Sequence, residues 1–122
     1  MLPTQTILVI DDEINTVDIL GLILQNAGYK VMCETDGRLL FLENNEIPDL
    51  IVLDNSLGES DGAEICTMLK KPGLTSRIPI IMISATPEIE SLALNAGADA
   101  FLSKPFSMQQ LLSLIEEHLA LK

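Results

Sequence analysis

Short runs of consecutive apolar residues recur along the chain, and several of them end at a polar residue. These runs show no alternation of polar and apolar positions, which is typical of strands buried on both faces of a parallel sheet. One strand-like segment is less apolar and carries Lys30 and Glu34, so it suits the edge of a sheet. The strands expected are 7–10, 30–35, 50–53, 78–83 and 100–103.

Between the expected strands, apolar residues recur every three or four positions, as on one face of a helix. Gly28 and Gly97 are typical helix stops, Pro87 suits a first helical turn, and Ser107 with Gln110 forms a capping box. The first helix presents Val17, Leu20, Leu24 and Ala27, and we expect Ile19, Leu22 and Ile23 to widen this apolar face. Further helices are expected at 38–44, from a cap at Asp61 with Glu64 to about Lys70, from Pro87 to Gly97, and from Ser107 onward.

Five strands alternating with helices predict an α/β fold, a single doubly wound parallel sheet with helices on both faces. The least apolar strand belongs at an edge, and the first and third belong inside. The flavodoxin-like strand order 2-1-3-4-5 satisfies both conditions, and it places a ligand crevice between the carboxyl ends of the first and third strands.

Composition limits the alternatives. The 122 residues, 48% of them hydrophobic, suit one domain spanning 1–122. A net charge of −11 disfavours direct nucleic-acid binding, and 3% aromatic residues offer little stacking surface for a flavin or a single strand. No apolar stretch is long enough for a membrane span and no leader pattern is present, so we expect a cytoplasmic protein without a membrane partner.

The two cysteines, Cys33 and Cys66, are far apart in sequence, and the chain has one histidine and no C-x-x-C motif. Neither a zinc site nor a disulfide is therefore indicated. We expect both cysteines to be buried, reduced thiols.

Three carboxylates follow two of the most apolar runs. Asp11 and Asp12 follow the first strand, and Asp54 follows the third. All three should meet at the crevice, where like charges repel unless a cation is bound or a proton is retained. Ser84 and Lys104 follow the last two strands. A carboxylate nucleophile with Mg²⁺ and a lysine can accept a phosphoryl group, so the pattern predicts a metal-assisted phosphoryl site.

The same residues carry a family resemblance along nearly the whole chain. The segments I-L-V-I-D-D-E at 7–13, I-V-L-D at 51–54, I-M-I-S-A at 81–85 and G-A-D-A-F-L-S-K-P-F at 97–106 resemble the receiver domain of bacterial two-component response regulators. In this family the acidic pair, the lone Asp, the Ser or Thr and the Lys-Pro pair occur in this order.

The resemblance implies a role for each matching residue. Asp54 would take a phosphoryl group from a histidine kinase or a histidine phosphotransfer protein. Asp11, Asp12, Asp54 and the backbone carbonyl of Ser56 would hold Mg²⁺. Ser84 and Lys104 would bind the phosphoryl group, and a cis bond would join Lys104 to Pro105. Phe101 would be the aromatic switch residue, and the output would be binding to an unknown downstream protein; a dimer formed on phosphorylation is also compatible.

Two features depart from the family pattern. Gly58 stands where a proline is usual after the phosphoacceptor, and glycine samples more backbone conformations. The stretch from Ser84 to Gly97 is shorter than usual, so we expect a short or reoriented fourth helix.

Two other classes of protein share part of the pattern. A small haloacid dehalogenase-like phosphatase or phosphotransferase would use Asp11 as nucleophile, but it expects an Asp where Glu13 stands and a cap domain for which the chain has no room. A flavodoxin-like electron carrier would need a Ser/Thr/Gly-rich phosphate loop after the first strand, which is absent from the sequence. Taken alone, Asp11 or Asp12 could also be a helix cap. Asp54 could cap a turn, Ser84 could be a turn residue and Lys104 a solvated charge.

Overall fold

The computed structural model describes residues 4–35, 40–44, 46–57 and 60–120. Its main strands are β1 (Thr6–Ile10), β2 (Lys30–Glu34), β3 (Leu50–Asp54), β6 (Ile80–Ser84) and β7 (Ala100–Ser103). The helices are α1 (Ile14–Asn26), α2 (Leu40–Glu43), α3 (Gly62–Leu69), α4 (Glu90–Asn95) and α5 (Met108–Ala120), and a 3₁₀ turn, η1, covers Pro87–Ile89. A small antiparallel pair, β4 (Ser56–Leu57) and β5 (Ser60–Asp61), completes the described elements.

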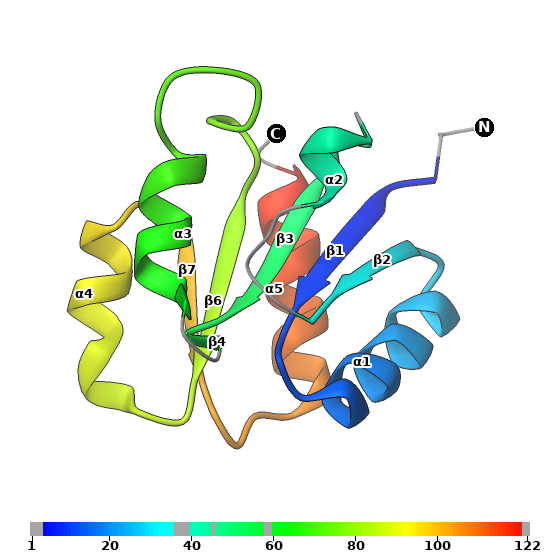
Figure 1. Cartoon of the computed structure of the whole chain (residues 1–122). Helices are drawn as coiled ribbons and strands as arrows, with labels where there is room; N and C mark the ends of the chain where they lie inside the picture. Colours follow the sequence, from blue (N-terminus) through cyan, green and yellow to red (C-terminus); the bar gives the residue numbers. More distant parts are fainter. Residues whose placement is uncertain (1–3, 36–39, 45, 58–59, 121–122) are drawn as a thin grey trace.

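The five main strands form one parallel sheet in the order β2-β1-β3-β6-β7 (Figure 1). This is the predicted order 2-1-3-4-5, with the least apolar strand at one edge. Because all five strands run in the same direction, their carboxyl ends lie along one edge of the domain. The fold therefore brings the residues that follow β1, β3, β6 and β7 to the same side.

The core has two layers, one on each face of the sheet. Successive residues of β3 alternate between them: Ile51 and Leu53 pack with α3, while Leu50 and Val52 pack with α1 and α5. All five β3 residues are buried, since helices cover both faces (Figure 1). This two-sided burial explains why the strand reads as a continuous apolar run.

Several predicted element boundaries are confirmed. Gly28 and Gly97 have φ values of 100° and 108° and follow the ends of α1 and α4. Ser107 and Gln110 cap each other, with the Ser107 amide donating to the Gln110 side chain and the Gln110 amide donating to the Ser107 hydroxyl oxygen. Pro87 begins the turn that leads into α4. Local capping signals were therefore sufficient at these four positions.

Other expectations need correction. Cys33 is exposed, not buried, because β2 is an edge strand that no further strand covers within the described residues. Ile19 and Leu22 are also exposed, so the apolar face of α1 is narrower than expected. The fourth strand begins at Ile80 and not at 78, and the short β4–β5 pair before α3 was not among the expected strands.

The fourth helix is short, as expected: α4 has six residues and η1 supplies the turn before it. The second helix is described only from Leu40 to Glu43, and Arg38 lies outside the described residues. Gly58 and the side chain of Asp61 also lie outside them, so the altered loop and the expected cap remain predictions. Within the described ranges no helix is long and apolar enough to cross a membrane.

Candidate phosphoryl and metal site

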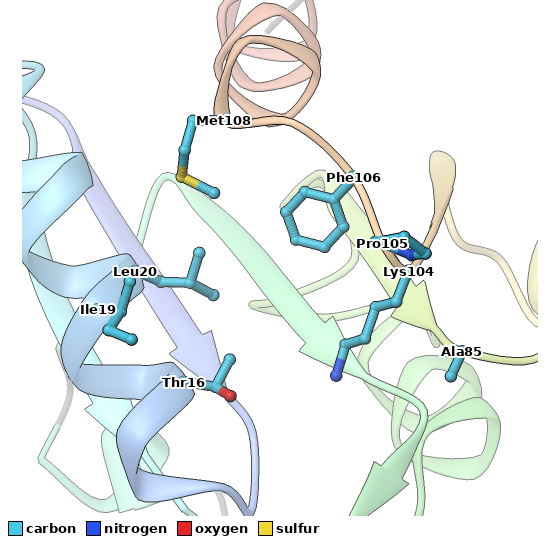
Figure 2. A pocket seen from close by; sticks show the side chains of 8 residues that line it. All are labelled: Thr16, Ile19, Leu20, Ala85, Lys104, Pro105, Phe106 and Met108. Carbon is cyan, nitrogen blue, oxygen red and sulfur yellow. The ribbon is translucent and has the colours of Figure 1, made fainter.

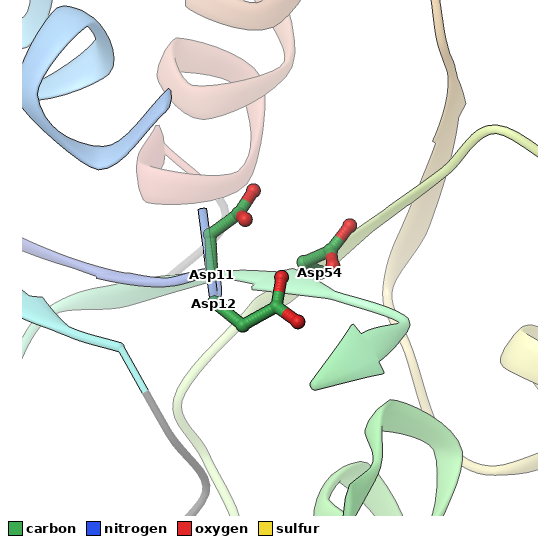
Figure 3. Close-up of side chains that lie close together, drawn as sticks. All are labelled: Asp11, Asp12 and Asp54. Carbon is green, nitrogen blue, oxygen red and sulfur yellow. The ribbon is translucent and has the colours of Figure 1, made fainter. Parts of the chain in front are cut away.

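The three predicted carboxylates converge at the carboxyl edge of the sheet. One carboxylate oxygen from each of Asp11, Asp12 and Asp54 lies within 4.8 Å of the others. Figure 3 shows the side chains of Asp11, Asp12 and Asp54 close together. Asp11 and Asp54 are buried and Asp12 is exposed, so the cluster opens to solvent on the Asp12 side.

Backbone hydrogen bonds fix both ends of this cluster. The amide of Asp11 donates to the carbonyl of Glu34 at 3.1 Å, which extends the β1–β2 ladder by one residue. Asp11 Oδ1 then accepts the Glu13 amide at 2.9 Å, just before α1 begins. Asp54 is the last residue of β3, and the amide after it, at Asn55, donates to the carbonyl of Ile83 at 2.9 Å. Asp11 and Asp54 are therefore held at the end of the sheet.

Lys104 supplies the positive charge of the site. Its Nζ donates to Asp54 Oδ1 at 3.2 Å and lies 3.8 Å from Asp11 Oδ2. Its own amide donates to the carbonyl of Ser84 at 2.8 Å, which places the residue beside the end of β6. The bond from Lys104 to Pro105 is cis, as the motif implied.

Burial raises the pKa of the Asp54 carboxyl, and the negative charges of Asp11 and Asp12 raise it further, while Lys104 opposes them. The Asp54 carboxylate is therefore destabilised by its surroundings when no additional cation is present. A divalent cation would relieve that repulsion, and three carboxylates are the hard oxygen ligands that Mg²⁺ prefers. The residues present thus fit a magnesium ion.

Ser84 lies at the end of β6 and is buried, with 4% of its surface exposed. Its hydroxyl oxygen accepts the amide of Thr86 at 3.0 Å. Phe101 lies in β7 opposite Met82 and packs, half-buried, against the core layer beneath α3. Ser56 begins β4, two residues after Asp54. All residues predicted for the site therefore lie at or near the carboxyl edge of the sheet. Phe101 lies further from this edge, within β7.

The site occupies a cleft of about 490 Å³. Sequence reasoning missed several of its lining residues, among them Thr16, Asn55 and Thr86. Asn55 directly follows Asp54, and its Oδ1 is buried without a hydrogen-bond partner among the described residues. These residues belong to no motif in the sequence. Only their nearness in sequence to Asp54 and Ser84 could have suggested Asn55 and Thr86 as lining residues.

An apolar groove of about 550 Å³ adjoins the cleft and shares Thr16, Ala85 and Lys104 with it. Figure 2 shows this groove between Ile19 and Leu20 of α1 on one side and Phe106 on the other. Ile19, whose exposure contradicted the sequence prediction, lines this groove. The cleft is thus polar and the groove next to it is apolar.

The chain belongs to the family of response regulator receiver domains, whose family model matches residues 7–116. These domains are phospho-accepting switches of two-component signalling, and the strand order and acidic cluster described above agree with that class. The match gives no support to the haloacid dehalogenase alternative.

Two curated regulators and one solved structure illustrate the similarity. The chain is 41% identical over 107 residues to the alkaline phosphatase synthesis transcriptional regulatory protein PhoP of Bacillus subtilis, covering 85% of this chain and 44% of that protein. It is 36% identical over 123 residues to SphR, of the same description, from Synechococcus elongatus, covering 91% and 47%. A CheY-like receiver domain protein from Methanospirillum hungatei superposes with a TM-score of 0.87 at 32% identity, covering 97% and 95%. The chain therefore spans less than half the length of these two curated relatives.

Proposed function

We propose that Asp54 accepts a phosphoryl group from the phosphohistidine of a histidine kinase or histidine phosphotransfer protein. The observation that carries this proposal is the meeting of three carboxylates and one lysine at the carboxyl ends of β1, β3 and β7. Of the three acids, Asp54 is the one in direct hydrogen bond with Lys104. It is also the last residue of a strand that is buried along its whole length.

In the proposed reaction a carboxylate oxygen of Asp54 attacks phosphorus and the bond from phosphorus to the histidine nitrogen breaks. The electron pair of that bond returns to the imidazole, and an acyl phosphate forms on Asp54. Lys104 would pair with a phosphoryl oxygen and so offset charge that accumulates as the group is transferred. The domain itself supplies these groups, so the transfer onto Asp54 is self-catalysed and the chain is a switch rather than a turnover enzyme.

Asp11, Asp12, Asp54 and the carbonyl of Ser56 would hold Mg²⁺, which neutralises charge on the transferring group when bound. The close carboxylate oxygens of the three acids support their part in this ligand set, and so does the raised pKa of Asp54. Asp11 is buried, and its Oδ1 accepts the Glu13 amide, which orients its carboxylate. Asp12 is exposed, so an ion arriving from solvent would reach this carboxylate first.

Phosphorylation of Asp54 would change the conformations of Ser84 and Phe101. The Ser84 hydroxyl, which now accepts the Thr86 amide, would turn to donate to a phosphoryl oxygen. The space it leaves would let Phe101 move inward and change the surface near β7. A hydrogen bond to a charged group contributes about 1.5–3 kcal/mol, which limits the bias between the two states to about a hundredfold.

The phosphodonor protein would cover the cleft, and the adjoining apolar groove offers the surface for it. The groove shares Lys104 with the cleft, so a helix lying in it would bring a histidine of the same protein close to Asp54. A downstream protein would bind the surface near β7. The net charge of −11 argues against direct contact with nucleic acid by this domain.

The test is mass spectrometry of the purified chain after incubation with acetyl phosphate and Mg²⁺. We expect addition of one phosphoryl group to the wild type and none to Asp54→Asn. Asp18→Asn, which changes an exposed acid on α1, is the matched control and should be modified like the wild type. Full modification of Asp54→Asn would overturn the assignment.

A further inference from the structure

Gly62, the first residue of α3, lies against the backbone that carries the proposed phosphoacceptor. Its amide donates to the carbonyl of Asn55 at 2.8 Å. The β4–β5 pair explains this approach, because Ser56 pairs with Asp61 and the chain returns directly to the Asp54–Asn55 peptide. Gly62, seven positions after Asn55 in the sequence, thus lies against the end of β3.

The contact leaves no room for a side chain. A Cβ at Gly62 would lie 2.7 Å from the Cα of Asn55 and 2.8 Å from the carbonyl oxygen of Asp54. Both are backbone atoms, so no side-chain rotation can relieve the clash. Gly62 is not one of the described glycines that have a positive φ. The need for glycine at this position therefore comes from the close contact and not from backbone conformation.

The Asp54–Asn55 peptide is therefore held from two sides. On one side the Asn55 amide donates to Ile83 of β6, and on the other side Gly62 contacts Asp54 and Asn55 directly. A side chain at position 62 would push this peptide away from α3. The Asp54 carboxylate, which is attached to the same short segment, would move with it relative to Lys104 and the acidic pair.

We propose that Gly62 is a positioning residue for phosphoryl transfer, whose missing side chain sets the place of the Asp54 carboxylate. The proposal rests on the proposed function of Asp54. A displacement of reacting groups by about 1 Å can slow a reaction about a hundredfold. A contact made with backbone atoms can therefore affect the rate although Gly62 touches neither phosphoryl donor nor metal.

The experiment compares Gly62→Ala with Gly21→Ala. A Cβ at Gly21, in α1, would meet Val31 and Cys33 at 3.9 and 4.0 Å, which is ordinary contact. Both variants are assayed with acetyl phosphate at saturating Mg²⁺, at a temperature where circular dichroism shows them folded. We expect Gly62→Ala to lower the maximal rate about tenfold or more, without recovery at higher donor concentration, and Gly21→Ala to keep the wild-type rate.

The amide NMR signals of Asn55 and Ile83, recorded without metal or donor, give a second readout. They should shift in Gly62→Ala and stay in place in Gly21→Ala. Wild-type signals and a wild-type rate in folded Gly62→Ala would overturn the proposal. If the wild type itself takes no phosphoryl group, the function proposed for Asp54 fails, and the role in phosphoryl transfer proposed for Gly62 fails with it. The NMR comparison then still shows whether Gly62 sets the position of this peptide.

Should Gly62→Ala not fold, the double variant Asn55→Gly/Gly62→Ala replaces it, with Asn55→Gly as its control. Glycine at position 55 gives the obstructed peptide more conformations in which to adapt. We expect the double variant to fold and to react more slowly than Asn55→Gly. Equal rates in these two variants would overturn the proposal.

Discussion

Lys104 lies between two buried carboxylates that come from different strands, with its Nζ 3.2 Å from Asp54 and 3.8 Å from Asp11. Its side chain is one-third exposed, so water screens part of this attraction. Removal of the ammonium would leave two buried like charges without their nearest counter-charge. The lysine is thus as much a part of the stability of the metal-free domain as of its proposed chemistry.

We predict that Lys104→Ala lowers the free energy of unfolding without Mg²⁺ by about 1–2 kcal/mol, less than for a fully buried ion pair because of its exposure. Urea unfolding at neutral pH measures this difference. Lys71→Ala, at an exposed position, is the control and should have little effect. An unchanged unfolding midpoint for Lys104→Ala would mean that solvent already screens both carboxylates.

Asp54→Asn should stabilise the metal-free domain at neutral pH. The folded-state pKa of Asp54 is raised by burial and by Asp11, so the folded protein holds this proton more tightly than the unfolded chain. The group therefore contributes stability below the unfolded pKa, near 4, and that contribution is lost as the pH rises through the folded pKa. Thermal unfolding from pH 3 to 8 should show the advantage of Asp54→Asn growing with pH. An advantage that is constant over this range would contradict the electrostatic explanation.

Mg²⁺ affinity should be lost in Asp12→Ala and weakened in Asp11→Ala. Each change deletes a carboxylate ligand, and each also relieves repulsion in the metal-free state. Asp12→Ala should therefore raise metal-free stability. In Asp11→Ala this gain is offset by about 0.5–1.5 kcal/mol, because the Glu13 amide loses its acceptor. Calorimetric titration with Mg²⁺ measures both affinities, and an unchanged value for Asp12→Ala would require a different ligand set.

Ser84→Ala should leave Asp54 able to accept a phosphoryl group while reducing the response around Phe101. The variant also removes the acceptor for the Thr86 amide, at a cost of about 0.5–1.5 kcal/mol. Amide NMR with and without a stable phosphoryl mimic measures the response. Ser84→Thr keeps the hydroxyl and should respond as the wild type does. Equal shifts near Phe101 in Ser84→Ala and wild type would show that the hydroxyl does not carry the coupling.

The two thiols should differ in reactivity. Cys66 is fully buried and burial raises its pKa to about 11, while Cys33 is exposed with a pKa raised to a smaller extent by partial burial and Asp18. A thiol reagent at pH 8 should label Cys33 alone in the folded protein and both cysteines in denaturant. Cys33→Ser should abolish labelling of the folded protein. Equal labelling of Cys66 would mean that the core beneath α3 opens readily.

The sheet and the site could be predicted because both depend on strands buried on two faces. The continuous run of apolar residues before Asp54 indicated a strand buried on both faces. Because parallel strands share one direction, Asp11, Asp54 and Lys104 were expected at one edge of the sheet. Exposure was harder to predict. Ile19 fits the helical spacing of α1, but spacing locates the centre of an apolar face and does not fix its width. Gly62 gave no signal, since its role depends on how the chain returns after β4.

The edge strand β2 carries Lys30 at its first position and Glu34 at its last. Its outer backbone groups face no other strand among the described residues, so they could pair with a strand of another molecule. Such pairing would require both charges to lose part of their hydration, and two copies that each carry eleven excess negative charges would also repel one another. The residues that mark β2 as an edge in the sequence therefore also protect the domain from edge-to-edge aggregation.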